Sequence, residues 1–502
     1  MYSNLEEPLR ADTSLTPIRE RLTEAQTRAR ELGRPVLVSR TVLRDRRAPN
    51  PNPEPFERYM LWEQAERGFS LTALGVAQTL GAAGRTRFGD IRTQLDDVVT
   101  GALVEHEEGA PQDLPLALAG FSFDPEHSCT TKWSGYPDAL AFIPRLLYVR
   151  IGNDRYLTTN VLVDVETRID TLVGAMAKDL ARAITPMDPR AVELPQLQET
   201  GPDARDAWEA NVRSLTDLIA RGEAEKVVLA RRYTVEAGAS IDVAATLVRL
   251  RGKYPGCTVF AVRNGDACFL GATPEMLVRL RDGVVSADCL AGSARRGANE
   301  DEDETIGTAL LADDKERREH AMVVRGLVDS LTGVCESIDV PEMPVLKRMA
   351  NVQHLHTPLR ATIPGDGHVL DLVERLHPTP AVGGLPRARA MCLIRQHESF
   401  DRGWYAGPLG WIDARGGGEF AVALRSALVE GNRASLYAGC GIVRGSAPAR
   451  EYDESKLKLS AVLSALGTVV DGQGGREANG QSRTGEPASG LADAQVKSGR
   501  AR

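Results

Sequence analysis

Paired cysteines are absent from this chain. Its seven cysteines are scattered over 502 residues, and no two are spaced as C-x-x-C. Small disulfide scaffolds and structural zinc sites both depend on clustered cysteines. The pattern therefore argues against both, and it predicts reduced thiols, most of them in the core of a cytoplasmic protein.

Long apolar runs are also absent. No segment approaches the roughly 20 apolar residues of a membrane-spanning helix. The first residues, MYSNLEEPLRADT, contain acids where a secretory signal would have an apolar stretch. We therefore expect neither a membrane span nor a secretory signal.

An excess of basic residues is missing as well. Lys and Arg number 61 and Asp and Glu number 69, which gives a formal net charge of −8. Nucleic acids and anionic membrane surfaces attract proteins that have basic patches. The charge balance thus predicts that neither is a partner.

What remains is an ordinary globular composition, with 42% hydrophobic and 26% charged residues. Strand-like segments occur in series with helical ones and without a regular βαβ repeat, which predicts an α+β fold. A Pro-containing linker over 189–201 spans the boundary between an N-terminal portion, residues 1–200, and a second region, 201–467. The polar, Gly- and Ser-rich stretch 471–502 is expected to be disordered.

Two predicted helices have charged residues where their apolar stripes should continue. In the helix over 314–331, stepping back in fours from Leu331 leads to Glu319. In the helix over 451–466, the same spacing leads to Lys458 and Glu454, and Glu451 lies three residues earlier. Residues four apart share one helix face, so these groups should point toward the core.

Buried carboxylates need a partner or a metal ion. Mg²⁺ prefers oxygen ligands and would leave coordination positions open for an anionic substrate. The alternative is that each carboxylate lies exposed in a first helical turn or pairs with a nearby arginine. Periodicity alone favours this alternative.

Lys226 and Glu275 are candidates for acid–base chemistry. Lys226 begins a predicted strand among apolar residues, where an amine can become a general base, although a lysine at a strand end is usually solvated. Glu275 follows Thr273-Pro274, a typical helix start, so we expect it in a first helical turn. A role as a catalytic acid there would require burial.

Other candidates are more ambiguous. Arg425, within FAVALRSAL, needs a carboxylate from the protein or from a ligand. His377 precedes a Gly-rich loop and is by itself typical of a loop. His354 and His356 alternate on a predicted strand, but a zinc site lacks a third ligand at a recognisable spacing.

The glycines Gly439, Gly441 and Gly445 form G-x-G-x-x-x-G, which is not the dinucleotide-binding spacing. Glycines here would still let backbone amides approach an anionic ligand closely.

Together and in this order, these segments resemble those of the chorismate-utilising enzymes. That family includes isochorismate synthase, the large component of anthranilate synthase, aminodeoxychorismate synthase and salicylate synthase. The resemblance covers about half of the chain, from about Glu225 to Leu466, and implies a large mixed or antiparallel β-sandwich core with helices packed outside. Residues 1–200 would then be an N-terminal α/β portion of the same fold, and 201–467 the chorismate-binding catalytic region. The matching segments are KVVLAR (226–231), GATPEMLV (271–278), LAGSARRG (290–297), DKERREH (314–320), LHPTPAVGGLP (376–386), DRGWYAGPLGW (401–411), VALRSA (422–427), YAGCGIV (437–443) and EYDESKLK (451–458).

The resemblance also implies roles for single residues. Lys226 matches the general base that activates water at C2 of chorismate, and Glu275 matches the general acid that protonates the leaving C4 hydroxyl. The implied Mg²⁺ ligands are Glu319 and Glu454, with Glu451 close by. The implied substrate-binding residues are Ala291, Gly292, Ser293, His377, Tyr405, Arg425, Gly439, Gly441 and Lys458.

Within the family, three positions favour one member. Ala291 stands where aminodeoxychorismate synthases have a nucleophilic lysine. The loop PAVGG resembles that of isochorismate synthases, whereas anthranilate and salicylate synthases tend toward T-x-S-G. Lys226 suits water rather than ammonia as the nucleophile. Ser293 departs from the threonine of many relatives but retains the hydroxyl.

The expected activity is that of an isomerase, isochorismate synthase, which adds water at C2 of chorismate and releases the C4 hydroxyl reversibly. Salicylate synthase and component I of anthranilate synthase are the enzymatic alternatives. A catalytically silent chorismate-binding subunit is the third, although it would need neither Lys226 nor Glu275. We expect a monomer or weak homodimer that supplies menaquinone or siderophore synthesis.

Overall fold

The computed structural model describes residues 16–126, 131–186, 194–200, 205–350, 352–365 and 367–470. The predicted disordered tail, 471–502, lies outside these ranges, so its disorder stays a prediction. The division of the chain at residue 200 also stays a prediction. Part of the predicted linker is a strand, β10 (Gln196–Glu199), which pairs with β11 (Lys226–Ala237). None of the helices in the described ranges is both long and apolar enough to cross a membrane.

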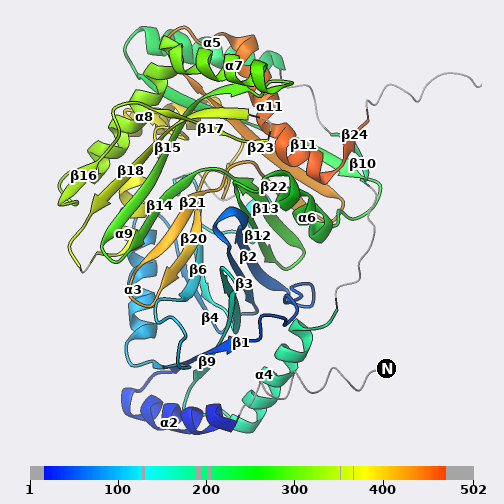
Figure 1. The fold of residues 1–502 in the computed structure, drawn as a ribbon, viewed down its shortest axis with the longest axis vertical. Helices are drawn as coiled ribbons and strands as arrows, with labels where there is room; N and C mark the ends of the chain where they lie inside the picture. The colour runs from blue at the N-terminus through cyan, green and yellow to red at the C-terminus, as the bar shows by residue number, and fades with distance from the viewer. Residues whose placement is uncertain are drawn as a thin grey trace, which may run out of the picture.

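Two large β-sheets form the centre of the molecule (Figure 1). The described part of the first sheet has the order β24-β10-β11-β23-β22-β13-β12-β2-β3-β8-β9-β1-β5, with β19 beside β11. Its remaining strands are β1 (Val36–Arg44), β2 (Arg58–Gln64), β3 (Phe69–Leu74), β5 (Leu103–His106), β8 (Leu146–Ile151), β9 (Asp154–Val163), β12 (Thr258–Asn264), β13 (Ala267–Thr273), β19 (Gly384–Leu385), β22 (Ser426–Glu430), β23 (Arg433–Ile442) and β24 (Thr468–Val469).

The second sheet has the order β16-β18-β15-β14-β21-β20-β6-β7-β4, with β17 beside β18. Its strands are β4 (Gln78–Ala82), β6 (Pro115–Phe121), β7 (Ala139–Ile143), β14 (Met276–Arg281), β15 (Val284–Arg295), β16 (Ser337–Asp339), β17 (Val345–Arg348), β18 (Val352–Thr362), β20 (Pro408–Asp413) and β21 (Gly418–Val422).

Most neighbouring strands are antiparallel, whereas β1 pairs with β5 and β10 with β24 in parallel. Aromatic side chains from both sheets, such as Trp62, Phe269 and Phe420, share one buried core. Helices surround the sheets, with α2 and α4 at one end of the molecule and α5 and α7 at the other (Figure 1). The predicted α+β class, with mixed and antiparallel sheets, is confirmed. The helices are α2 (Thr16–Leu32), α3 (Arg87–Val99), α4 (Ile169–Ala183), α5 (Arg205–Ala220), α6 (Val243–Lys253), α7 (Glu300–Ala312), α8 (Asp314–Leu331), α9 (Val369–Leu376), α10 (Arg387–His397) and α11 (Pro448–Leu466).

The link between β13 and β14 carries the chain from the first sheet to the second. The expected helix start at this point is wrong. The Glu275 N–H does donate to the Thr273 hydroxyl (3.3 Å), as at a helix start. However, the Val422 N–H of β21 donates to the Glu275 carbonyl (3.1 Å), and the Thr273 hydroxyl donates to the Val422 carbonyl (2.5 Å). Pairing with a distant strand therefore overrides the local preference, and it leaves Glu275 between the sheets.

Candidate functional site

A cavity of about 90 Å³ is bounded by strands β11 and β23 of the first sheet, β15 and β18 of the second, and helices α8 and α11. All but two of the predicted site residues line it, although they come from segments far apart in the sequence. These residues are Lys226, Glu275, Ala291, Gly292, Ser293, Glu319, Tyr405, Arg425, Gly439, Gly441, Glu454 and Lys458.

Lys226 is the first residue of β11 and is only 1% exposed. Its ammonium lies 2.8 Å from a carboxylate oxygen of Glu319 on α8. Burial opposes ionisation of Glu319, but the charge of Lys226 outweighs it and lowers the pKa of that carboxyl. Gly441 on β23 leaves room for the pair, since a Cβ at this position would lie 2.3 Å from Glu319 Oε1 and 2.7 Å from Lys226 Cε.

Glu275 is 5% exposed and faces the same cavity. Burial, and then the negative charge of Asp288, raise the pKa of Glu275 to about 8. The carboxyl therefore keeps its proton at neutral pH, and it can donate that proton to a leaving group.

Arg425 precedes β22 and is 7% exposed. One guanidinium nitrogen donates to His354 Nε2 (2.8 Å), and the other contacts Met349 Sδ (3.0 Å). Among the described residues, no carboxylate lies within ion-pair distance of Arg425 (4.0 Å), so the alternative of an internal ion pair is not realised there. A buried cation in this position is suited to the carboxylate of a ligand.

His354 is fixed in one tautomer by this contact. Because Arg425 can only donate, His354 Nε2 must accept, and Nδ1 carries the proton. His354 Nδ1 faces the Gly292 carbonyl (3.1 Å) and the Ser293 hydroxyl (3.0 Å). Burial and the charge of Arg425 hold the pKa of His354 well below its usual range. The histidine thus acts as a neutral spacer between Arg425 and the Ala291–Ser293 segment, and it is not paired with His356 in a metal site.

The Ala291–Ser293 segment contains a β-bulge, where the register between β15 and β18 shifts. Gly292 has φ 78°, a conformation that glycine adopts without strain. The bulge turns the Ser293 N–H toward Glu316, whose carboxylate accepts it (3.2 Å). Ala291 places a methyl group, and no nucleophile, at the cavity wall.

Four carboxylates gather beside the cavity, from two helices. Glu316 and Glu319 are three residues apart on α8, and Glu451 and Glu454 are three apart on α11. Burial and the charge of Glu319 raise the pKa of Glu316, and burial and the charge of Glu454 raise the pKa of Glu451. A cluster of hard oxygen donors with unfavourable mutual repulsion fits a divalent cation such as Mg²⁺.

Lys315 and Cys440 complete this cluster. The Lys315 ammonium lies 3.4 Å from Glu451 and 3.5 Å from Glu316. Cys440 Sγ lies within 4.8 Å of carboxylate oxygens of Glu451 and Glu454. Burial raises the pKa of Cys440 well above its ordinary value, and its thiol donates to the Glu451 carbonyl (3.2 Å). Apart from this sulfur, the donors are carboxylate oxygens, which suit Mg²⁺.

Glu451 does not line the cavity itself. It is buried in the first turn of α11, behind Glu454, and contacts Lys315. Lys458, one turn further along α11, donates to Glu454 (2.8 Å) and to the Gly439 carbonyl (3.0 Å). Burial alone would lower the pKa of Lys458, but the charge of Glu454 outweighs it and raises the pKa.

His377 is the second predicted residue that the structure places away from the cavity lining. Its Nε2 donates to the Phe123 carbonyl (3.0 Å), and its ring packs edge-on against that of Phe123. Phe123 in turn supports Arg402, whose guanidinium lies 4.2 Å from the ring centroid. A direct contact between His377 and a ligand in the cavity would require this packing to change.

Sequence reasoning missed Glu316 and Arg402. Glu316 lies three residues before Glu319, so its helical spacing could have indicated it. Arg402 lines the cavity, pairs with Glu398 (2.5 Å) and donates to the carbonyls of Val228 (2.8 Å) and Val382 (2.9 Å). No sequence spacing indicates these backbone contacts, because they join three distant segments.

Tyr405 packs face to face on Tyr437, with ring centroids 5.3 Å apart. Burial raises the pKa of Tyr405 to about 12, so the hydroxyl at the cavity wall stays neutral and can donate a hydrogen bond.

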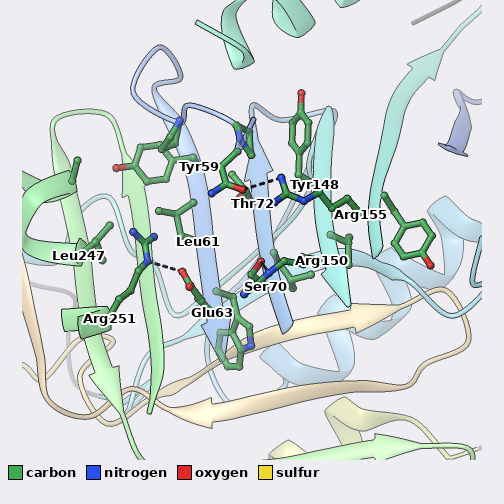
Figure 2. A pocket seen from close by; sticks show the side chains of 18 of the residues that line it. Tyr59, Leu61, Glu63, Ser70, Thr72, Tyr148, Arg150, Arg155, Leu247 and Arg251 are labelled. Carbon is green, nitrogen blue, oxygen red and sulfur yellow. Dashed lines mark hydrogen bonds and ion pairs between the residues drawn. The ribbon is translucent and has the colours of Figure 1, made fainter. Parts of the chain in front are cut away.

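A larger hollow of about 360 Å³ lies on the outer face of β2, β3 and β8, and none of the predicted site residues lines it (Figure 2). Its guanidinium groups have partners within the chain. Arg251 pairs with Glu63 (2.5 Å), Arg150 contacts Ser70 (3.4 Å) and Arg155 donates to the Ala48 carbonyl (2.5 Å). The smaller cavity, with its buried acid, amine and guanidinium, is therefore the candidate site of chemistry.

Known proteins resemble this chain over most of its length. A family model described as chorismate binding enzyme matches residues 33–467. The salicylate biosynthesis isochorismate synthase of Pseudomonas aeruginosa is 39% identical over 82% of this chain and 85% of its own length. The isochorismate synthase MenF of Bacillus subtilis is 33% identical over 89% and 97%.

Among solved structures, the menaquinone-specific isochorismate synthase MenF of Escherichia coli aligns with a TM-score of 0.70 and 27% identity, over 89% of this chain and 99% of that one. The family model and the relatives cover most of the chain, and the solved structure shares its fold. The chain belongs to the chorismate-binding enzymes.

Proposed function

We propose that the protein is an isochorismate synthase, an isomerase that interconverts chorismate and isochorismate. The observation that carries this assignment is the pair of buried groups facing one cavity: the Lys226 amine and the Glu275 carboxyl, which holds its proton up to a pH of about 8. The isochorismate synthases among its relatives match over most of both chains.

In the forward reaction, the Lys226 ammonium must first release the proton that it holds toward Glu319. The neutral amine then takes a proton from water as the water oxygen bonds to C2 of the ring. Glu275 gives its proton to the C4 hydroxyl, whose bond to carbon breaks as the double bonds shift. Water enters and water leaves, so the same residues with exchanged roles serve the reverse reaction. Each acid–base partner contributes on the order of 10²–10⁴ in rate.

Binding residues hold the substrate's two carboxylates. Arg425, fixed by His354, would bind the enolpyruvyl carboxylate, and the Tyr405 hydroxyl and the Gly439–Gly441 backbone would lie beside it. Arg402 also lines the cavity, together with Val228 and Val382, whose carbonyls accept its hydrogen bonds. The Lys458 ammonium is paired with Glu454, so it would bind a substrate carboxylate only after this ion pair separates.

We further propose a Mg²⁺ requirement, with Glu319 and Glu454 as ligands. Glu451 lies close to Glu454, and the charge of Glu319 acts on Glu316. The cation would neutralise and orient the ring carboxylate of the substrate. The support for this proposal is the gathering of four carboxylates on α8 and α11, two of them with a raised pKa.

Product analysis tests the function. The protein is incubated with chorismate and Mg²⁺, and the products are separated by chromatography. We expect isochorismate, and the same equilibrium mixture when the reaction starts from isochorismate. Salicylate with pyruvate as the main products would indicate a salicylate synthase, and anthranilate formed only with ammonium would indicate an anthranilate synthase. Binding of chorismate without any turnover would indicate a silent subunit.

The net charge of −8 and the scattered cysteines support a cytoplasmic location without nucleic-acid or membrane partners, and we propose a monomer or weak homodimer. Size-exclusion chromatography over a range of concentrations tests the oligomeric state.

A further inference from the structure

Three charged or titratable side chains from the second sheet form a connected group behind Glu275. Asp288 lies on β15, Lys347 on β17 and His356 on β18. The Lys347 ammonium donates to one carboxylate oxygen of Asp288 (3.3 Å), and His356 Nε2 lies 2.8 Å from the other. Both oxygens of Asp288 are therefore engaged, which fixes its orientation.

This group is attached to the segment that carries Glu275. Lys347 also donates to the carbonyl of Pro274 (3.0 Å), the residue immediately before Glu275. The backbone of Glu275 is held on its other side by Thr273 and Val422. Lys347 thus adds a third attachment, at the point where the chain passes from one sheet to the other.

Asp288 and Lys347 approach Glu275 from outside the site. They do not line the cavity that contains Lys226 and Arg425, but a separate one of about 230 Å³. Pro274 lines both cavities, so the Pro274–Glu275 segment is part of the wall between them. A substrate in the first cavity would therefore touch Glu275 without touching Asp288.

The charges of the two residues act on Glu275 in opposite directions. After burial, Asp288 is the group that raises the pKa of Glu275 most, whereas Lys347 lowers it. Burial opposes the charge of Asp288 itself, but the hydrogen bond from His356 and the charge of Lys347 outweigh burial and lower the pKa of Asp288. The titratable and charged groups that face Glu275 are Asp288 and Cys289 of β15, Lys226 of β11, Lys347 of β17, Lys458 of α11 and Arg425.

We propose that Asp288 is a positioning residue for the acid step: from outside the site, the Lys347 ammonium bound to its carboxylate fixes the Pro274–Glu275 segment, while the carboxylate itself opposes ionisation of Glu275. The proposal rests on the role of Glu275 as the acid in the proposed function. Under this proposal, Asp288 never touches the substrate, but it determines the pH up to which Glu275 stays protonated.

The test compares kcat/KM over pH for wild type, Asp288→Asn and Lys347→Met, with chorismate and saturating Mg²⁺. Asp288→Asn removes the like charge, so the alkaline limb of the profile should move to lower pH by about one unit. At about pH 8.5 the activity would then fall roughly fivefold to tenfold below wild type, while at about pH 6 it changes little. Lys347→Met removes a positive charge that favours ionisation of Glu275, so it should move the alkaline limb to higher pH.

Asp179→Asn is the matched control. Asp179 is a similarly buried aspartate on α4 that pairs with Arg145 (2.7 Å), and it does not act on Glu275. Its alkaline limb should coincide with that of wild type. Thermal unfolding shows which variants fold, and if Asp288→Asn fails to fold, the shift of Lys347→Met decides the outcome.

Two results would overturn the proposal: an alkaline limb that stays in place in both folded variants, or one that moves in the same direction in both. Failure of the proposed function gives a different result, because wild type would then form no isochorismate. If Glu275 is not the acid, the alkaline limb of wild type would persist in Glu275→Gln.

Discussion

The side chain of Glu275 holds a proton that an exposed glutamate would lose near pH 4.5, since burial raises its pKa to about 8. We therefore expect kcat/KM to fall as the pH rises through about 8. Glu275→Gln should reduce turnover on the order of 10²–10⁴-fold at neutral pH, while chorismate binding measured by calorimetry persists. Turnover like that of wild type would contradict the acid assignment.

The same residue should lower the stability of the fold in alkaline solution. The native state holds the Glu275 proton between pH 4.5 and about 8, whereas the unfolded chain releases it, so the free energy of unfolding declines as the pH rises through this window. Glu275→Gln has no carboxyl proton at this position, so it removes that loss of stability. The variant should be more stable than wild type by about 2–4 kcal/mol above pH 8, and equally stable near pH 4. Urea unfolding at the two pH values measures the difference.

Gly441 tests how closely the Lys226–Glu319 pair is packed. In Gly441→Ala, the added methyl would meet Glu319 Oε1 and Lys226 Cε, both movable side-chain atoms. The fold should therefore tolerate the change, with a loss of stability near 1 kcal/mol, while turnover falls at least tenfold. In Gly439→Ala the added methyl meets the Leu229 backbone carbonyl at 2.9 Å, so that variant should lose more stability. Equal loss of stability in both variants would contradict this account.

At the scale of elements, helical periodicity predicted the bounds of a helix best where its apolar stripe was long. Helix α8 has the predicted bounds, and the Asp282-Gly283 turn joins β14 to β15 as expected, both residues having positive φ. Helix α11 begins at Pro448, three residues before the predicted start, because its first turn precedes the apolar stripe. The link at Glu275 could not be predicted, since its partner Val422 is 147 residues away and only the assembled sheets bring them together.

Helices α8 and α11 also define the proposed cation site. Glu454→Gln removes one oxygen ligand and one negative charge, so the affinity for Mg²⁺ should fall at least tenfold. Calorimetric titration with Mg²⁺ in the absence of substrate measures this directly. Asp453→Asn, one position earlier and exposed on the same helix, is the control and should bind Mg²⁺ as wild type does. Equal affinity in wild type and Glu454→Gln would exclude Glu454 as a ligand.

At the scale of the whole molecule, the site exists only where two sheets and two helices meet. Lys226 and Glu454 are separated by 228 residues, yet they line one cavity. Sequence spacing indicated the α8 and α11 groups separately, and the family resemblance connected them with Arg425 and Glu275. It did not indicate that His354 fixes Arg425, or that His377 packs behind Phe123, because these contacts depend on packing between strands and loops.

This assembly implies that the ligand stabilises the whole fold. A ligand that binds only the native state raises its stability by about 2.7 kcal/mol at a hundredfold excess over Kd. Chorismate with Mg²⁺ should therefore raise Tm by several degrees in Glu275→Gln, which binds without turnover. Adding Arg425→Met to that variant should remove most of the shift, because the ligand carboxylate loses its partner. Without ligand, the double variant should be no less stable than the Glu275→Gln single variant. The reason is that Arg425 has no carboxylate partner among the described residues. A large loss of stability without ligand would show that Arg425 serves the fold and not the substrate.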